Sequence, residues 1–183
     1  MPFIIIAAVI LLDQLTKNIV VTYLQPVTSV PIIDKILYFT YHENSGAFMG
    51  MFSDARWVFM ITSSVALLAM IGYIIYSRKK QKPALLIISL AMMAGGGIGN
   101  MIDRIALKYV IDFIEFRVIN FPIFNIADSF ITIGAALFII YYVKYEITVS
   151  EKHPAITSED YDKPVNNKNN EQALSEKGDK NER

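Results

Sequence analysis

The chain contains no cysteine and only two histidines, His42 and His153. Without thiols it forms no disulfide, carries no thiol nucleophile and offers no Cys ligand to a metal. Two histidines cannot build a histidine-rich metal site. We therefore expect neither a bound metal nor an organic cofactor, so any catalysis has to use other side chains.

An excess of charge of either sign is also missing, since 17 basic and 17 acidic side chains give a formal net charge of zero. This balance gives no indication of a nucleic-acid partner. Apolar residues dominate instead, at 54% of the chain with a mean hydropathy of +0.39. With 183 residues, the chain is too apolar for an ordinary soluble domain and too short for a large transporter. These values indicate a small polytopic membrane protein.

Four segments are long and apolar enough to cross a bilayer, which takes about 20 mainly apolar residues. They are residues 2–24, 57–76, 83–102 and 122–145. The first segment lacks the basic start and the small-residue cleavage site of a removable signal peptide, so it is interpreted as a retained span. We therefore predict one membrane domain, residues 1–150, of all-α class with four transmembrane helices.

The orientation of these helices follows from the basic loop 78–82, the densest short cluster of positive charge near a span. Positively charged loops stay in the cytoplasm, which predicts cytoplasmic termini and two outer segments, 25–56 and 103–121. The first outer segment is rich in β-branched and aromatic residues and predicts a small extracytoplasmic β-element. Residues 151–183 have few apolar and many charged side chains, which predicts a disordered cytoplasmic tail.

Asp112 and Asp128 interrupt an otherwise apolar stretch. An ionised aspartate near the middle of a bilayer costs roughly 2.5 to 3.5 kcal/mol, so such a residue is a functional candidate. Two neighbouring carboxylates share one proton and can serve as general base and general acid in one reaction. The pair is therefore suited to hydrolysing a peptide bond, although the sequence does not assign the two roles.

Other polar residues gather at the same outer side of the predicted membrane. Asp13 and Lys17 are four residues apart, so they share a helix face and can pair. Asn100, Asp103 and Arg104 share a face at the outer end of the third span. We interpret Asp13 with Lys17, and Asp103 with Arg104, as buried pairs that support the site.

Three asparagines, Asn44, Asn100 and Asn125, are candidates for orienting a catalytic carboxylate or the substrate backbone. Gly46 suits a close approach of two backbones. Together with the two pairs above, these residues form the predicted supporting and substrate-binding set around Asp112 and Asp128.

Five motifs occur along the chain in a fixed order. They are Asp13-Gln14-x-x-Lys17, Asn44-x-Gly46-Ala47, Gly95-Gly96-x-x-Gly99-Asn100-x-x-Asp103-Arg104, Val110-x-Asp112-Phe113 and Phe124-Asn125-x-Ala127-Asp128. In order and spacing they resemble the lipoprotein signal peptidases, also called signal peptidase II. The resemblance covers roughly residues 2 to 146.

This resemblance implies an intramembrane aspartic peptidase of the bacterial cytoplasmic (inner) membrane, with Asp112 and Asp128 as the catalytic pair near its outer face. It implies that the substrates are prolipoproteins, cut just before a cysteine that carries a diacylglyceryl group. We expect the substrate to enter sideways from the membrane lipid. We further expect a monomer that binds no nucleic acid.

Three alternatives remain open from the residues alone. A small proton-coupled membrane transporter would use Asp13, Asp103 and Asp128 as a relay. A Ser/Lys hydrolase would use Lys17 as a base for a serine, either Ser45 or Ser129. A non-catalytic membrane scaffold would leave the two-aspartate arrangement without a purpose.

Overall fold

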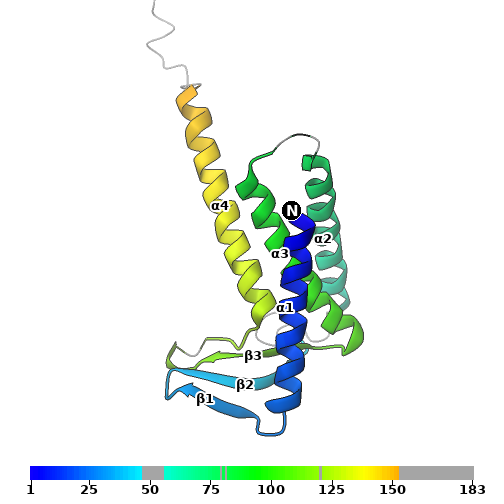
Figure 1. The fold of residues 1–183 in the computed structure, drawn as a ribbon, viewed down its shortest axis with the longest axis vertical. Coiled ribbons are helices and arrows are strands. Elements are labelled where there is room, and N and C mark those ends of the chain that lie inside the picture. Colours follow the sequence, from blue (N-terminus) through cyan, green and yellow to red (C-terminus); the bar gives the residue numbers. More distant parts are fainter. Residues whose placement is uncertain (47–55, 79, 81, 120, 153–183) are drawn as a thin grey trace, which may run out of the picture. The chain divides into compact units, whose positions relative to one another are not determined.

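The computed structural model describes residues 1–46, 56–78, 80, 82–119 and 121–152. Residues 153–183, nearly all of the predicted tail, lie outside this description, as do Ala47 of the second motif and Lys79 of the basic loop. The elements follow one another as α1 (Pro2–Tyr23), β1 (Ser29–Ile33), β2 (Leu37–Asn44), α2 (Arg56–Arg78), α3 (Ala84–Ala106), β3 (Val110–Phe116), the 3-10 turn η2 (Arg117–Ile119) and α4 (Ile126–Lys152) (Figure 1).

Within the described residues, four helices are long and apolar enough to cross a membrane. They correspond to the four predicted spans, with two shifts near the site. Helix α3 continues to Ala106, and α4 begins at Ile126 rather than at Pro122. The start of α4 moves because Phe124 exchanges backbone hydrogen bonds with Ile114 of β3. Asp128 consequently lies in the first turn of α4 and not in the second.

The all-α class is too narrow, because the described residues include a three-stranded antiparallel sheet in the order β1-β2-β3. The predicted outer β-element supplies β1 and β2, whereas β3 comes from the second outer segment, where no strand is expected. Residues 110–116 are rich in β-branched and aromatic side chains that suit a strand, and their backbone pairs with β2. The sheet lies at the end of the helices where α1 ends and α4 begins (Figure 1).

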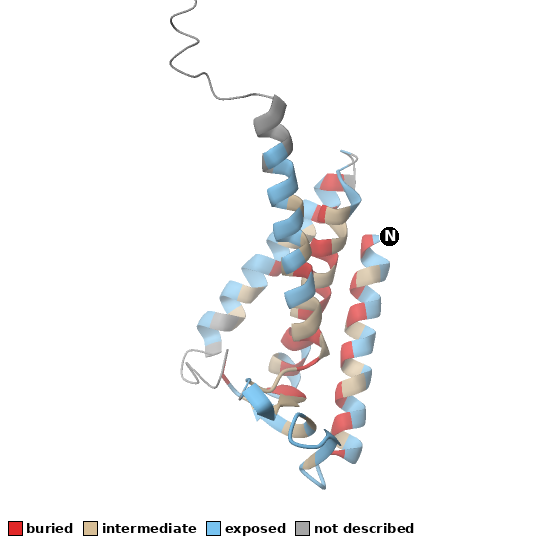
Figure 2. Cartoon of the chain, turned by 90° about the vertical axis from the view of Figure 1, so that its left-hand side faces the viewer, coloured by how far each residue is buried: buried red, intermediate tan, exposed pale blue. Residues whose placement is uncertain are grey.

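Helices α1 and α3 pack closely. The buried residues of α1 recur every three or four positions and so form one face of the helix, visible in Figure 2; they are Pro2, Ile6, Val9, Asp13, Lys17 and Val20. Opposite this face, α3 presents glycines. A Cβ atom added at Gly95 would lie 2.8 Å from Cβ of Val9. Small residues therefore let the two backbones approach, as is common in membrane helix pairs.

We expect Gly99→Ala to destabilise the helix pair, because a Cβ at this position would lie 2.5 Å from Oδ2 of the buried Asp13. Overpacking of this kind costs about 1 to 3 kcal/mol, so the unfolding temperature in detergent should fall. Gly72→Ala is the matched control, since no atom lies within 4 Å of its added Cβ. Equal unfolding temperatures for the two variants would contradict the packing role of Gly99.

Candidate active site

Asp128 is held at the start of α4 by a reciprocal cap. The N–H of Asp128 donates to Oδ1 of Asn125 at 2.9 Å, and the N–H of Asn125 donates to Oδ2 of Asp128 at 3.2 Å. This is the geometry of a capping box, in which the residue before the helix and the third helical residue satisfy each other's backbone donors. The spacing Asn125-x-x-Asp128 therefore both begins α4 and orients the carboxylate.

Asp112 is held on β3 by two amide groups. Its Oδ2 accepts a hydrogen bond from Nδ2 of Asn44 at 2.8 Å, and its Oδ1 accepts one from Nδ2 of Asn125 at 2.7 Å. Asn44 is fixed in turn, because its Oδ1 accepts the backbone N–H of Gly46 at 3.1 Å. The side chain of Asp112 is only 1% exposed, so both of its carboxylate oxygens are oriented by the protein.

The electrostatic surroundings of Asp112 favour its protonated form. The pKa of its carboxyl group is raised from 3.8 to about 7, mainly by burial. The nearby charge of Asp128 acts in the same direction, whereas the hydrogen bond from Asn44 lowers the pKa. A carboxyl group with a pKa near 7 is present in both protonation states at neutral pH. Such a group is suited to general acid and base chemistry.

Asn100 of α3 is hydrogen-bonded to Asp128, to Asn125 and to the buried Lys17 of α1. Its Nδ2 donates to Oδ1 of Asp128 at 2.7 Å. Its Oδ1 accepts hydrogen bonds from Nδ2 of Asn125 at 3.0 Å and from Nζ of Lys17 at 2.9 Å. Because Asn125 also contacts Asp112, two asparagines form a continuous amide bridge between the carboxylates.

A buried ion cluster lies beneath this bridge. Nζ of Lys17 is 2.9 Å from Oδ2 of Asp13 and 2.9 Å from Oδ2 of Asp103. The Asp13 carboxylate also accepts the N–H of Ala127 at 3.0 Å, and that of Asp103 accepts the N–H of Ile111 at 3.2 Å. The cluster therefore contacts the backbone next to each of the two candidate catalytic residues.

The predicted pairing of Asp103 with Arg104 is wrong, because Asp103 pairs with Lys17 instead. Consecutive residues on a helix point in different directions, whereas Lys17 faces α3 from α1. Nη1 of Arg104 donates to the backbone oxygen of Asn100 at 3.4 Å. The predicted pair of Asp13 and Lys17 is present.

Gln14 is a polar residue of the site to which the sequence assigned no role. Its Nε2 donates to Oδ1 of Asp103 at 2.9 Å and to the backbone oxygen of Gly99 at 3.2 Å. The sequence does indicate this residue, because an amide side chain next to Asp13 is unusual in an otherwise apolar span. Its partner on α3 becomes visible only when the two helices are placed together.

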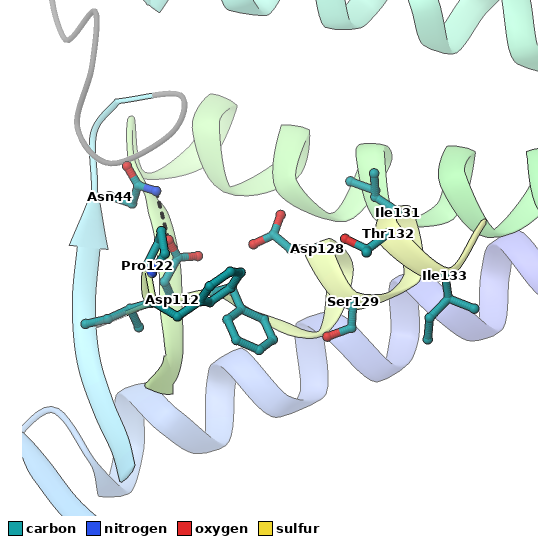
Figure 3. A pocket seen from close by; sticks show the side chains of 11 residues that line it. Asn44, Asp112, Pro122, Asp128, Ser129, Ile131, Thr132 and Ile133 are labelled. Atoms are coloured by element: carbon teal, nitrogen blue, oxygen red, sulfur yellow. Dashed lines mark hydrogen bonds between the residues drawn. The ribbon is translucent and has the colours of Figure 1, made fainter. Parts of the chain in front are cut away.

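Asp112 and Asp128 line one pocket of about 440 Å³ (Figure 3). Asn44 lies at the same polar end, whereas most of the remaining lining is apolar and comes from residues 121–124 and 131–133. Among the described residues, no three His, Cys, Asp or Glu side chains are grouped as a metal site requires. The pocket therefore combines a carboxylate pair with a surface suited to an apolar ligand.

Comparison with known proteins agrees with this arrangement. The family model of signal peptidase (SPase) II matches residues 5–144. The lipoprotein signal peptidase of Anoxybacillus flavithermus is 44% identical over 136 residues, which cover 73% of this chain and 79% of that protein. The lipoprotein signal peptidase of Geobacillus thermodenitrificans is 44% identical over 142 residues, covering 76% and 87% of the two chains.

A solved structure of a bacterial membrane enzyme has a TM-score of 0.71 and 32% identity to this chain, covering 86% of it and 94% of that enzyme. A second bacterial membrane enzyme has a TM-score of 0.68 and 34% identity, covering 78% and 92%. Nothing in these similarities favours the transporter alternative. The chain is thus a multi-pass membrane protein and belongs to the lipoprotein signal peptidase family, signal peptidase II, whose members cleave signal peptides from prolipoproteins.

Proposed function

We propose that Asp112 and Asp128 are the catalytic pair with which this peptidase cleaves prolipoproteins. The supporting observation is that both carboxylates line one pocket and are joined through the amides of Asn125 and Asn100. Two carboxylates in one site repel each other when both are ionised, so they favour a state that holds a single proton. That state provides one base and one acid.

The reaction then needs no further group. The ionised carboxylate removes a proton from water as the water oxygen attacks the scissile carbonyl carbon, and the protonated carboxylate donates its proton to the carbonyl oxygen. Collapse of the tetrahedral intermediate breaks the C–N bond. The carboxyl group that took the water proton gives it to the leaving amine. The other carboxylate removes a proton from a hydroxyl group of the intermediate as the C=O bond re-forms, so the pair again holds one proton. We assign no fixed order of base and acid to the two residues.

The apolar part of the pocket supports a substrate with a lipid group. We propose that the cleaved bond precedes a diacylglyceryl-modified cysteine and that the substrate enters sideways from membrane lipid. The basic loop 78–82 supports cytoplasmic termini, which would put the pocket near the outer face of the bacterial cytoplasmic membrane. The protein acts as a monomer in this proposal, because one chain carries both carboxylates.

Lys17 is poorly suited to the alternative Ser/Lys mechanism. Its ammonium group donates to Asp13, Asp103 and Asn100, and an ammonium group has only three protons to donate. Lys17 and its partners are therefore proposed as positioning residues.

Asp112→Asn and Asp128→Asn should each lower the turnover of a diacylglyceryl-modified prolipoprotein by about 10²- to 10⁴-fold, the usual contribution of a general acid or base. The measurement is cleavage by the purified protein in detergent, with the unfolding temperature of each variant recorded as the folding control. Because the two residues act as a unit, the double variant should be little slower than either single one. Near-normal turnover by a folded single variant would remove that residue from the pair.

The pH dependence of kcat/KM should show a fall on the alkaline side near pH 7. The pKa of Asp112 is raised to about 7 by burial, so its proton is lost as the pH rises through that value and the pair no longer contains an acid. The Asn44 hydrogen bond lowers this pKa. Asn44→Ala should therefore move the alkaline limb to higher pH, and a shift to lower pH would contradict the role of Asp112.

A further inference from the structure

The pocket continues from the two carboxylates along α4. Thr132 lines it four residues after Asp128 and lies on the same face of the helix. Four residues correspond to about 6 Å along the helix axis. Figure 3 shows Asp128, Ser129 and Thr132 projecting from the first two turns of α4 beside the pocket.

The hydroxyl group of Thr132 makes no hydrogen bond to any of the described residues, and its side chain is exposed. Ser129, in the same pocket, donates to the backbone oxygen of Asn125 at 3.1 Å. Hydroxyl groups elsewhere in the helices also donate to a backbone oxygen of the preceding turn; they include those of Thr16, Thr22, Thr62, Ser64 and Ser89. Thr132 therefore retains a donor that the protein itself does not use.

A peptide substrate needs such a donor at this depth. A peptide bond is accessible to the carboxylates only when the chain around it is extended, and an extended chain has lost the hydrogen bonds of a helix. In the apolar part of a membrane each unsatisfied backbone carbonyl costs several kcal/mol. Two residues of extended chain span about 6.6 Å, which is close to the axial separation of about 6 Å between Asp128 and Thr132.

We propose that the Thr132 hydroxyl donates a hydrogen bond to a backbone carbonyl of the signal peptide, two residues before the scissile carbonyl. Thr132 is then a substrate-binding residue that sets the register of the peptide on the carboxylate pair. This inference rests on the proposed catalytic pair, because Asp128 marks the position of the scissile bond.

The first test compares Thr132→Val, which removes the hydroxyl at almost unchanged volume, with Thr132→Ser, which keeps it. Leaving a substrate carbonyl without a partner costs roughly 1 to 3 kcal/mol, so kcat/KM should fall about 5- to 150-fold in Thr132→Val and recover in Thr132→Ser. Thr62→Val, on the exposed face of α2, is the control and should keep wild-type kcat/KM. Wild-type kcat/KM in Thr132→Val would overturn the inference.

The second test identifies the bound carbonyl with synthetic diacylglyceryl peptides. A thioamide, which accepts hydrogen bonds more weakly, replaces the carbonyl at one, two or three residues before the scissile carbonyl. Only the thioamide that lies two residues before the scissile carbonyl should lower kcat/KM of the wild type. In Thr132→Val the same thioamide should cause no further decrease. If Thr132→Val instead removes the discrimination between ester-linked and ether-linked lipid, the hydroxyl binds the lipid ester, and the inference is wrong.

Both tests separate this inference from the proposed catalytic pair. Asp128→Asn is measured beside the Thr132 variants, with unfolding temperatures for all of them. Activity of folded Asp128→Asn would overturn the catalytic pair, and with it the assignment of the second carbonyl. Inactive Asp128→Asn together with wild-type behaviour of Thr132→Val would overturn only the role of Thr132.

Discussion

The rest of this structure depends on the buried ammonium group of Lys17. The side chain is only 2% exposed and lies between the carboxylates of Asp13 and Asp103. Removing one partner from such a buried cluster typically costs about 3 to 5 kcal/mol, because an uncompensated charge remains in an apolar interior. The cluster therefore holds α1 and α3 in one relative position, which the small residues of α3 make sterically possible.

The same charges also contact α4 and β3, the elements that carry Asp128 and Asp112. Asp13 accepts a backbone N–H from the first turn of α4, and Asp103 accepts one from β3 next to Asp112. Carboxylates are well suited to this task, since each has enough lone pairs to bind the lysine and a backbone donor at once. The cluster that joins α1 to α3 therefore also fixes the start of α4 and the strand β3. These two elements carry the aspartates of the pocket.

The pocket has a polar end and apolar walls. The carboxylates and Asn44 lie at one end, near the sheet, while apolar side chains from the connection before α4 and from its second turn form the other walls. Hydrolysis needs polar groups and water, whereas the lipid-bearing substrate that we propose would be stabilised by apolar contacts. Placing the aspartates at the start of α4 and on β3, instead of in the middle of a span, allows both requirements to be met within one pocket.

The four spans could be predicted without a structure, because a long apolar run is a local property. The sequence also identified the charged residues of the site, because an ionised group in an apolar segment costs several kcal/mol and is therefore rare without a function. The role of Gln14 was not recognised. Asn125-x-x-Asp128 was readable as a pair, but its function as the cap of α4 depends on where that helix begins. Phe124 moves that start by bridging to Ile114.

Two features could not be predicted without the folded chain: residues 110–116 form a strand, and Asp103 pairs with Lys17 instead of Arg104. Pairing of β3 with β2 joins segments about seventy residues apart, and a local pattern contains no information on such a partner. The Lys17 cluster likewise joins α1 to α3. Spans and residue types follow from local hydrophobicity, whereas pairings follow from which elements the folded chain brings into contact.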